Sequence, residues 1–161
     1  ALVDAVSDME GVAVFNLYEL SQEIAFNVDE WSKIISDASA VIYQFPFYWM
    51  SAPSLLKKWQ DEVFTFLSKT PAVAGKSLTV VTTTGSEYEA YRSGGRNRFT
   101  MDELLRPYQV SAIHSGMSWQ TPIVVYGMGT ADAGKNIAEG ANLYKQRVEM
   151  LIGSSNAGNN W

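Results

Sequence analysis

Short runs of β-branched and aromatic residues alternate along this chain with longer segments whose apolar residues recur every three or four positions. The short runs are residues 12–17 (VAVFNL), 40–45 (AVIYQF), 78–83 (LTVVTT) and 123–126 (IVVY), and each has the composition of a strand. Strands that alternate with helices form a parallel sheet through right-handed crossover connections. The sequence therefore predicts an α/β fold of three layers, with helices on both faces of a parallel sheet.

Helix signals stand between the predicted strands. Asn27 with Glu30, and Thr100 with Glu103, have the spacing of a capping box, so we expect helices to begin at both positions. Pro107 predicts a kink in the second of these helices. Helical spacing also predicts helices from the start of the chain to Gly11, from about residue 53, and along residues 137–151.

A chain of 161 residues has the length of one ordinary domain. Residues 1–152 carry the alternating pattern and are expected to form that domain. Residues 153–161 (GSSNAGNNW) have the Gly, Ser and Asn content of a flexible tail. No apolar run approaches the roughly 20 residues that cross a bilayer, and the hydrophobic share of 47% is typical of a globular protein. We therefore expect one domain with one cofactor site.

Composition excludes several kinds of chemistry. A formal net charge of -5, with scattered basic residues, gives no attraction to a phosphate backbone, so no nucleic-acid binding is expected. The chain has no cysteine and one histidine, which excludes thiolate nucleophiles, zinc–thiolate sites and polyhistidine metal sites. The phosphate-binding patterns GxGxxG and GxxxxGK[ST] are absent. The lack of cysteine and of a signal-peptide pattern at the start predicts a cytoplasmic protein.

The loop after residues 40–45 has an unusual composition: Pro46, Phe47, Tyr48, Trp49 and Met50 lead through SA to a second proline. Prolines restrict the backbone and can hold peptide groups outward, while the large side chains wall a flat pocket. A planar heteroaromatic ring with hydrogen-bonding edges fits both features. The alternative is an aromatic cluster that only closes the end of the sheet. Ligands of parallel sheets bind beyond the carboxyl ends of the strands, and this position favours a binding site.

A second loop, with Thr82, Thr83, Thr84 and Gly85, follows the next strand. Its small residues permit a ligand to approach the backbone closely, although threonine-rich strand ends also occur without function. Residues 87–99 are either a mobile lid or ordinary surface. His114 has no evident carboxylate or serine partner and is interpreted as a packing histidine.

Four segments carry a resemblance to a known family. They are residues 44–64 (QFPFYWMSAPSLLKKWQDEVF), 74–86 (AGKSLTVVTTTGS), 104–119 (LLRPYQVSAIHSGMSW) and 144–151 (YKQRVEML). Together they resemble the flavodoxin-like NAD(P)H quinone oxidoreductases, which include bacterial quinone reductases and the ancillary flavoproteins of glutathione-gated potassium efflux systems. The resemblance spans most of the chain and implies a flavodoxin-like fold.

The resemblance further implies a flavin, FMN rather than FAD, with its ring edge on the backbone of Pro46 to Met50 and of Thr82 to Gly85. Hydride from NAD(P)H would pass to the flavin, and a quinone would then accept two electrons in a ping-pong scheme. Tyr91 is the nearest match to a family tyrosine that binds substrate, with Tyr88 as the second choice. The family also implies a homodimer. The alternatives are a regulatory flavoprotein bound to a membrane transporter, a one-electron carrier of the flavodoxin type, and an inactive fragment.

The sequence departs from the family at three places. Arg96 and Asn97 stand where relatives often carry a histidine, so the acceptor range or the pH profile is expected to differ. The family begins with an apolar strand and a phosphate-binding loop, whereas this sequence begins in the helix that follows them. The stretch between residues 66 and 77 is also shorter than in relatives. We therefore expect the complete polypeptide to contain segments that this sequence lacks.

Overall fold

The computed structural model describes residues 1–20 and 25–157 and contains one parallel sheet. Strand β1 (Ala40–Pro46) pairs along its whole length with β2 (Ser77–Thr83). The opposite edge of β2 pairs first with β3 (Ser118–Trp119) and then, nearer its carboxyl end, with β4 (Ile123–Val125). All three pairings are parallel, so the expected strand–helix alternation is confirmed. The carboxyl ends of β1, β2 and β4 consequently lie together at one edge of the molecule.

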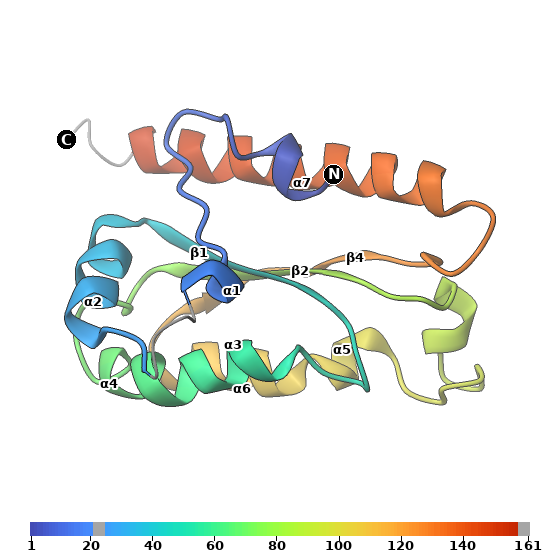
Figure 1. The fold of residues 1–161 in the computed structure, drawn as a ribbon, viewed down its shortest axis with the longest axis horizontal. Coiled ribbons are helices and arrows are strands. Elements are labelled where there is room, and N and C mark those ends of the chain that lie inside the picture. Colours follow the sequence, from blue (N-terminus) through green and yellow to red (C-terminus); the bar gives the residue numbers. More distant parts are fainter. Residues whose placement is uncertain (21–24, 158–161) are drawn as a thin grey trace.

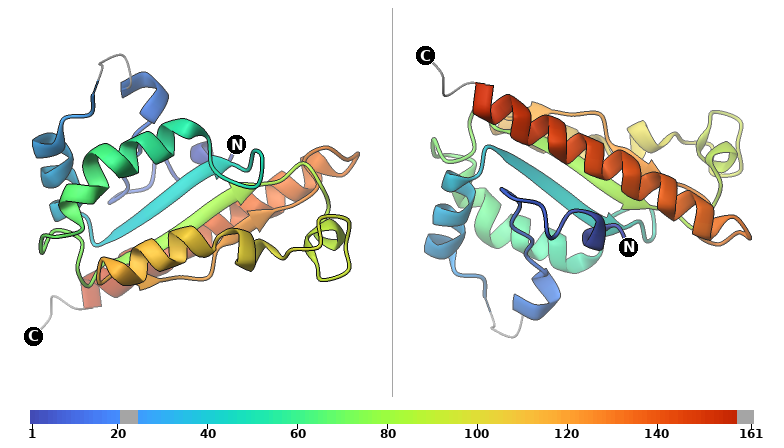
Figure 2. Two further views of the ribbon diagram at one scale, coloured as in Figure 1. Left: turned by 90° about the horizontal axis from the view of Figure 1, so that it is seen from below. Right: turned by 90° about the horizontal axis from the view of Figure 1, so that it is seen from above.

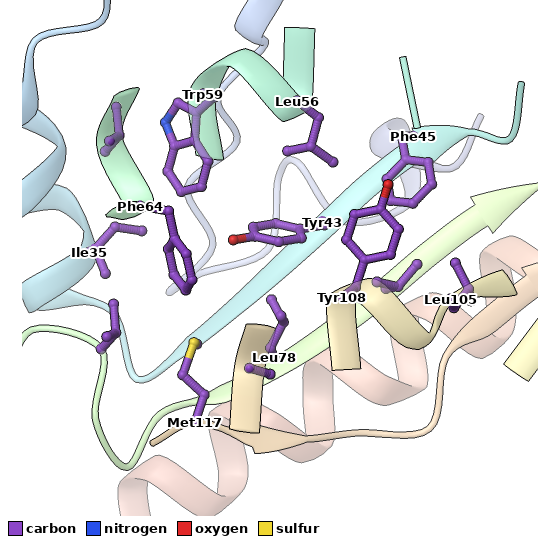
Figure 3. Packing of buried hydrophobic residues seen from close by; sticks show 14 of the residues in the cluster. Ile35, Tyr43, Phe45, Leu56, Trp59, Phe64, Leu78, Leu105, Tyr108 and Met117 are labelled. Carbon is purple, nitrogen blue, oxygen red and sulfur yellow. The ribbon is translucent and has the colours of Figure 1, made fainter. Parts of the chain in front are cut away.

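Most helices cover one face of this sheet (Figure 1). They are α2 (Val28–Asp37), α3 (Ser54–Trp59), the π-helical turn η2 (Gln60–Phe64), α4 (Thr65–Leu67), α5 (Met101–Leu104) and α6 (Arg106–His114). The larger hydrophobic cluster lies beneath them and is rich in aromatic rings. Figure 3 shows the Trp59 and Tyr43 rings, which meet edge to face with centroids 5.8 Å apart. This packing fixes α3 and thereby the loop that precedes it.

The long helix α7 (Ala133–Ala157) covers the other face, together with the 3-10 turn η1 (Val3–Ala5) (Figure 1). Tyr144 and Val148 of α7, Val81 of β2 and Val125 of β4 belong to this second cluster. Two short elements complete the description, α1 (Leu17–Leu20) and the 3-10 turn η3 (Tyr88–Tyr91). Helices thus lie on both faces, which confirms the predicted three layers.

Helices begin at both predicted caps, although only Thr100 with Glu103 forms a complete capping box. The Asn27 side chain accepts hydrogen bonds from the backbone N–H groups of Asp29 and Glu30 at the start of α2. Thr100 and Glu103 form a reciprocal capping box at the start of α5. Pro107 does not kink one helix, because it lies in the first turn of a separate helix, α6, where its missing N–H costs nothing.

The strand predicted at residues 12–17 is wrong. Residues 12–16 have no regular structure, and Leu17 begins the helix α1. A β-branched and aromatic composition favours a strand only where a neighbouring strand supplies backbone partners. Among the described residues β1 pairs only with β2, so residues 12–16 join no ladder.

Three other expectations differ from the structure. The helix expected from the start of the chain to Gly11 is limited to the 3-10 turn η1, and residues 6–11 form turns. Residues 153–157, expected in the flexible tail, continue α7, because adding a residue to an existing helix costs little compared with starting one. The rest of that predicted tail lies outside the described residues. His114 is exposed in the last turn of α6 and is not packed.

Candidate functional site

The loop after β1 folds into a tight turn of strained backbone. Tyr48 and Ser51 exchange two backbone hydrogen bonds, of 2.9 and 3.0 Å, as an antiparallel pair. Between them Trp49 and Met50 have φ of 48° and 61°. Two successive left-handed residues are the pattern of a type I′ turn, which normally selects Asn and Gly. A bulky pair in this conformation costs stability, and such strain clusters at functional sites.

Two neighbouring elements hold this turn in place. The Phe47 N–H donates to the Thr83 carbonyl oxygen at 2.9 Å, which extends the β1–β2 ladder into the loop. The Tyr108 hydroxyl of α6 accepts from the Ala52 N–H at 3.1 Å and lies 3.3 Å from the Ser51 hydroxyl. The turn is therefore fixed on both sides by residues that are distant in the sequence.

The loop after β2 is bonded to its neighbours on both sides. The Thr82 hydroxyl donates to the Phe45 carbonyl oxygen at 2.7 Å, and the Thr84 N–H donates to the Val125 carbonyl oxygen at 2.9 Å. The Gly129 N–H, in the loop after β4, donates to the Gly85 carbonyl oxygen at 2.9 Å. Three loops at the carboxyl edge of the sheet thus form one bonded framework.

The framework leaves a set of backbone donors facing solvent. Tyr48, Trp49, Met50 and Gly85 are exposed, with Trp49 98% accessible. No hydrogen bond within the described residues uses the N–H groups of Trp49, Met50 or Gly85. A Cβ added at Gly85 would meet no atom within 4 Å, so the space beside its backbone is open. The arrangement suits a flat ligand whose edge accepts hydrogen bonds.

The predicted cofactor residues differ in what they can offer such a ligand. Pro46, Tyr48, Trp49, Met50 and Gly85 are exposed, and Thr83 is partly buried. The side chains of Phe47, Thr82 and Thr84 are buried. These three can therefore contact a ligand only through their backbone, and their side chains shape the strand ends.

Tyr91 and Tyr88 belong to a row of rings beside the framework. The Phe47, Tyr91 and Tyr126 rings follow one another with centroids 6.3 and 5.9 Å apart, and Tyr88 meets Tyr126 at 5.3 Å. Tyr91 is only 6% accessible and supports the row from within, whereas Tyr88 is 48% accessible. Burial raises the pKa of Tyr126 to about 12, with Tyr88 and Asp102 adding to the shift, so this phenol stays neutral at ordinary pH.

Sequence reasoning missed two residues of this site. Tyr108 holds the aromatic turn, and Tyr126 links Tyr88 to Tyr91. Tyr126 is the last residue of a predicted strand, and this position at a strand end is the one signal that could have found it. In the part of the chain that the structure describes, no group of three or more Asp, Glu or His side chains could hold a metal ion.

The comparison with protein families settles the relationship. The sequence profile for proteins with a flavodoxin-like fold matches residues 1–148. The chain belongs to the flavodoxin-like fold family. The three layers and the site at the carboxyl ends of the strands agree with this membership.

Curated members of the family share a third of their residues with this chain. General stress protein 14 of Bacillus subtilis is 35% identical over 93% of this chain and 87% of its own length. The uncharacterized NAD(P)H oxidoreductase YdeQ of the same organism is 34% identical over 92% and 77%. The glutathione-regulated potassium-efflux system ancillary protein KefG of Pectobacterium atrosepticum is 33% identical over 78% and 70%.

Solved structures of this fold superpose closely. General stress protein 14 of Treponema denticola in complex with FMN has a TM-score of 0.82 and 27% identity, covering 93% of this chain and 88% of that chain. The NADPH-quinone reductase of P. pentosaceus has a TM-score of 0.76 and 27% identity over 91% and 85%. A structure described as a tryptophan halogenase from Streptomycin violaceusniger has a TM-score of 0.84 and 35% identity over 91% and 87%. These structures therefore share the fold, whereas their names differ in activity.

No helix among residues 1–20 and 25–157 combines the length and the hydropathy that crossing a membrane requires.

Proposed function

We propose that this protein binds FMN and reduces quinones with electrons from NAD(P)H in the cytoplasm. The observation that carries the proposal is the strained Tyr48–Ser51 turn, whose unpaired N–H groups stand beside the open backbone of Gly85. A flavin ring has the required shape, because it is flat and carries hydrogen-bond acceptors along one edge. Backbone donors at the ends of two parallel strands fit such an edge.

The chain's own residues position the ring in this proposal. The N–H groups of Trp49, Met50 and Gly85 donate to its polar edge, and the exposed Trp49 and Tyr48 side chains wall its faces. When bound, the flavin supplies hydride acceptance from NAD(P)H and two-electron transfer to a quinone. Tyr91 and Tyr88 line the substrate side, where a tyrosine hydroxyl can donate a hydrogen bond to a quinone oxygen.

The comparisons support the chemistry at the level of relatives. A structural neighbour of 27% identity was solved with FMN, another is named an NADPH-quinone reductase, and a curated relative is named an NAD(P)H oxidoreductase. NAD(P)H and the quinone cannot be bound together if both use the same face of the flavin ring. The oxidised nucleotide then leaves before the quinone binds, which is a ping-pong order.

A homodimer is part of the proposal. Val110 and Ile113 on α6 and Phe66 on α4 are large apolar side chains with more than half of their surface accessible, all on the helical face. A second copy could cover them and close the exposed side of the Trp49 turn. Light scattering of the purified protein would test this, and a monomeric mass would contradict it.

The decisive experiment is an absorbance scan of the protein with added FMN, followed by NADPH and then a benzoquinone. We expect a retained flavin band that bleaches with NADPH and returns with quinone. Protein without added FMN, given NADPH and then benzoquinone in the same way, is the control. No retention of flavin, or no bleaching of a retained flavin, would contradict the proposal.

A second function is favoured by the relationship to KefG, which is 33% identical over 78% of this chain. In that case the protein is a regulatory flavoprotein on a potassium-efflux transporter, and the redox state of the flavin matters more than turnover. Transporter-loaded vesicles whose potassium efflux responds to the added protein would favour this function. Fast quinone turnover without any effect on efflux would favour the enzyme.

A further inference from the structure

A groove of about 620 Å³ runs along the outer edge of β4, on the side away from β1. Figure 2 shows α7 lying beside β4, with the segment that contains η3 at one end. One end of the groove is lined by Tyr88, Tyr91 and Tyr126, and the other by Leu143, Arg147 and Met150. The groove is a second feature, separate from the flavin-facing turn.

The groove begins at the row of rings that borders the flavin site. Tyr91 lines the groove and also packs against Phe47 of the aromatic loop, with ring centroids 6.3 Å apart. From Tyr126 the groove follows the strand back to Thr121, where Arg147 Nη1 donates to the Thr121 carbonyl oxygen at 2.9 Å. At a rise of ~3.3 Å per residue this path is about 16 Å long. An extended ligand can therefore run from the tyrosine rings that border the flavin site to α7.

The charge of the groove differs from that of the whole molecule. The chain has a formal net charge of -5, yet two arginines, Arg92 and Arg147, and one acid, Asp102, line the groove. None of the ion pairs within the described residues includes either arginine. Arg92 lies over the Tyr88 ring, 5.3 Å from its centroid. A guanidinium has five N–H donors in a fork that fits phosphate, so this groove suits an anionic ligand.

The far end also offers an apolar surface. Leu143 and Met150 of α7 line the groove and are 56% and 58% accessible. They lie four residues before and three residues after Arg147, which places all three on one side of the helix. A flat base can lie on these side chains while a phosphate beside it meets Arg147.

We propose that this groove holds the adenosine end of NADPH, an inference that rests on the proposed function. The nicotinamide lies at the exposed Tyr88 ring, which Tyr91 supports from within through Tyr126. The pyrophosphate passes Arg92, and the adenosine with its 2′-phosphate reaches Arg147 at the far end. The phosphate contact at Arg147 makes the protein prefer NADPH to NADH.

The first test needs no catalysis. Adenosine 2′,5′-bisphosphate is titrated into the FMN-loaded protein and followed by NMR of the backbone amides. Binding should shift the amides of Val124, Arg147 and Met150 and leave the Tyr48–Ser51 turn unchanged. Shifts confined to other parts of the chain, or no binding at millimolar bisphosphate, would overturn the proposal.

Substitutions give the second test. Arg147→Gln should weaken bisphosphate binding and raise the KM for NADPH at least about tenfold, with the kcat and the KM for quinone unchanged. Arg147→Lys keeps the charge and should recover part of the loss. Arg92→Gln, on an exposed loop, should raise the KM for NADPH and NADH alike. Arg106→Gln on α6 removes an exposed arginine outside the groove and is the matched control.

The outcomes separate this proposal from the proposed function. If the protein fails to reduce quinones but binds the bisphosphate through Arg147, the groove proposal stands and the enzymatic function fails. If it reduces quinones and neither arginine substitution changes its nucleotide affinity, the groove proposal is wrong and the function stands.

Discussion

At the scale of single residues, the site depends on groups that hold others in place. Trp49 and Met50 occupy left-handed backbone, which costs roughly 1–2 kcal/mol for each residue other than glycine. The hydrogen bonds from Phe47 to Thr83 and from Ala52 to Tyr108 offset this cost and keep the turn in one geometry. A loop that already has its bound conformation loses less conformational entropy when a ligand binds, so less of the binding free energy goes into ordering the loop.

Tyr108 is the residue on which this argument can be tested. Tyr108→Phe keeps the ring but removes the hydroxyl that accepts from Ala52 N–H, and should lower the free energy of unfolding by about 1 kcal/mol. The Kd for FMN should rise as well, because the turn is no longer fixed. Urea unfolding and flavin titration measure the two effects. Tyr144→Phe, in the hydrophobic cluster beneath α7, is the control and should leave the FMN affinity unchanged. If Tyr108→Phe also leaves the FMN affinity unchanged, Tyr108 does not position the turn for the flavin.

Glu62 gives a prediction about pH. Hydrogen bonds from Lys58 and from the Phe26 N–H lower the pKa of this carboxyl below its ordinary value of 4.5. A carboxyl with a lowered pKa stabilises the fold above pH 4.5, and the contribution is lost as the pH falls through the lowered pKa. Glu62→Gln should therefore unfold at a lower urea concentration than the parent at pH 7, and the difference should shrink towards pH 3.

The matched control for that experiment is Glu149→Gln, which changes an exposed glutamate on α7. Its urea midpoint should follow that of the parent at both pH values. A gap between the Glu62→Gln variant and the parent that is equally wide at pH 3 and pH 7 would argue against the carboxylate as its cause.

At the scale of elements, the packing of α7 on β4 depends on one glycine. A Cβ at Gly140 would overlap the Val125 side chain, whereas a Cβ at Gly153 in the same helix would meet nothing within 4 Å. Gly153→Ala should raise the free energy of unfolding by up to about 1 kcal/mol, because alanine favours helix. Gly140→Ala should lower it by roughly 1–3 kcal/mol, the cost of overpacking.

A double variant identifies the cause of that loss. Val125→Ala removes the methyl groups that the new Cβ would strike, so Gly140→Ala should cost less in this background than in the parent. Equal costs in both backgrounds, measured by urea unfolding, would mean that the contact with Val125 is not what selects glycine.

The elements could be predicted where local signals and tertiary pairing agree. β1, β2 and β4 have buried apolar runs, and Asn27 and Thr100 cap helices as expected. Residues 12–16 have an equally favourable composition for a strand, but no strand beside them supplies backbone partners. The π-helical turn η2 lies within the predicted helix and has no signal in the sequence. The rings of Trp59, just before it, and of Phe64, its last residue, pack with centroids 6.1 Å apart.

At the scale of the whole molecule, the two predicted loops come together because parallel strands end at one edge of a sheet. That topological rule needs only the order of the elements, so the loops at Pro46–Met50 and Thr82–Gly85 could be found from the sequence. Tyr108, Tyr126 and the groove at Arg147 could not, because each depends on which helix packs beside which strand. The left-handed turn at Trp49 and Met50 could not be predicted from the sequence either, because such turns normally contain Asn and Gly.

A flavin that joins loops from two strands should stabilise the entire fold. A ligand bound only by the folded state adds about 2.7 kcal/mol when its concentration is 100 times the Kd. For a domain of this size each kcal/mol corresponds to roughly 2–4 °C in Tm, so saturating FMN should raise the Tm by about 5–11 °C.

Riboflavin, which lacks the phosphate, should give part of this shift through the ring contacts at Trp49, Met50 and Gly85. Trp49→Ala should leave the Tm of the flavin-free protein nearly unchanged, because this side chain is 98% accessible, and should reduce the shift with either flavin. If neither flavin moves the Tm, the aromatic turn only closes the end of the sheet, and its strained backbone needs another explanation.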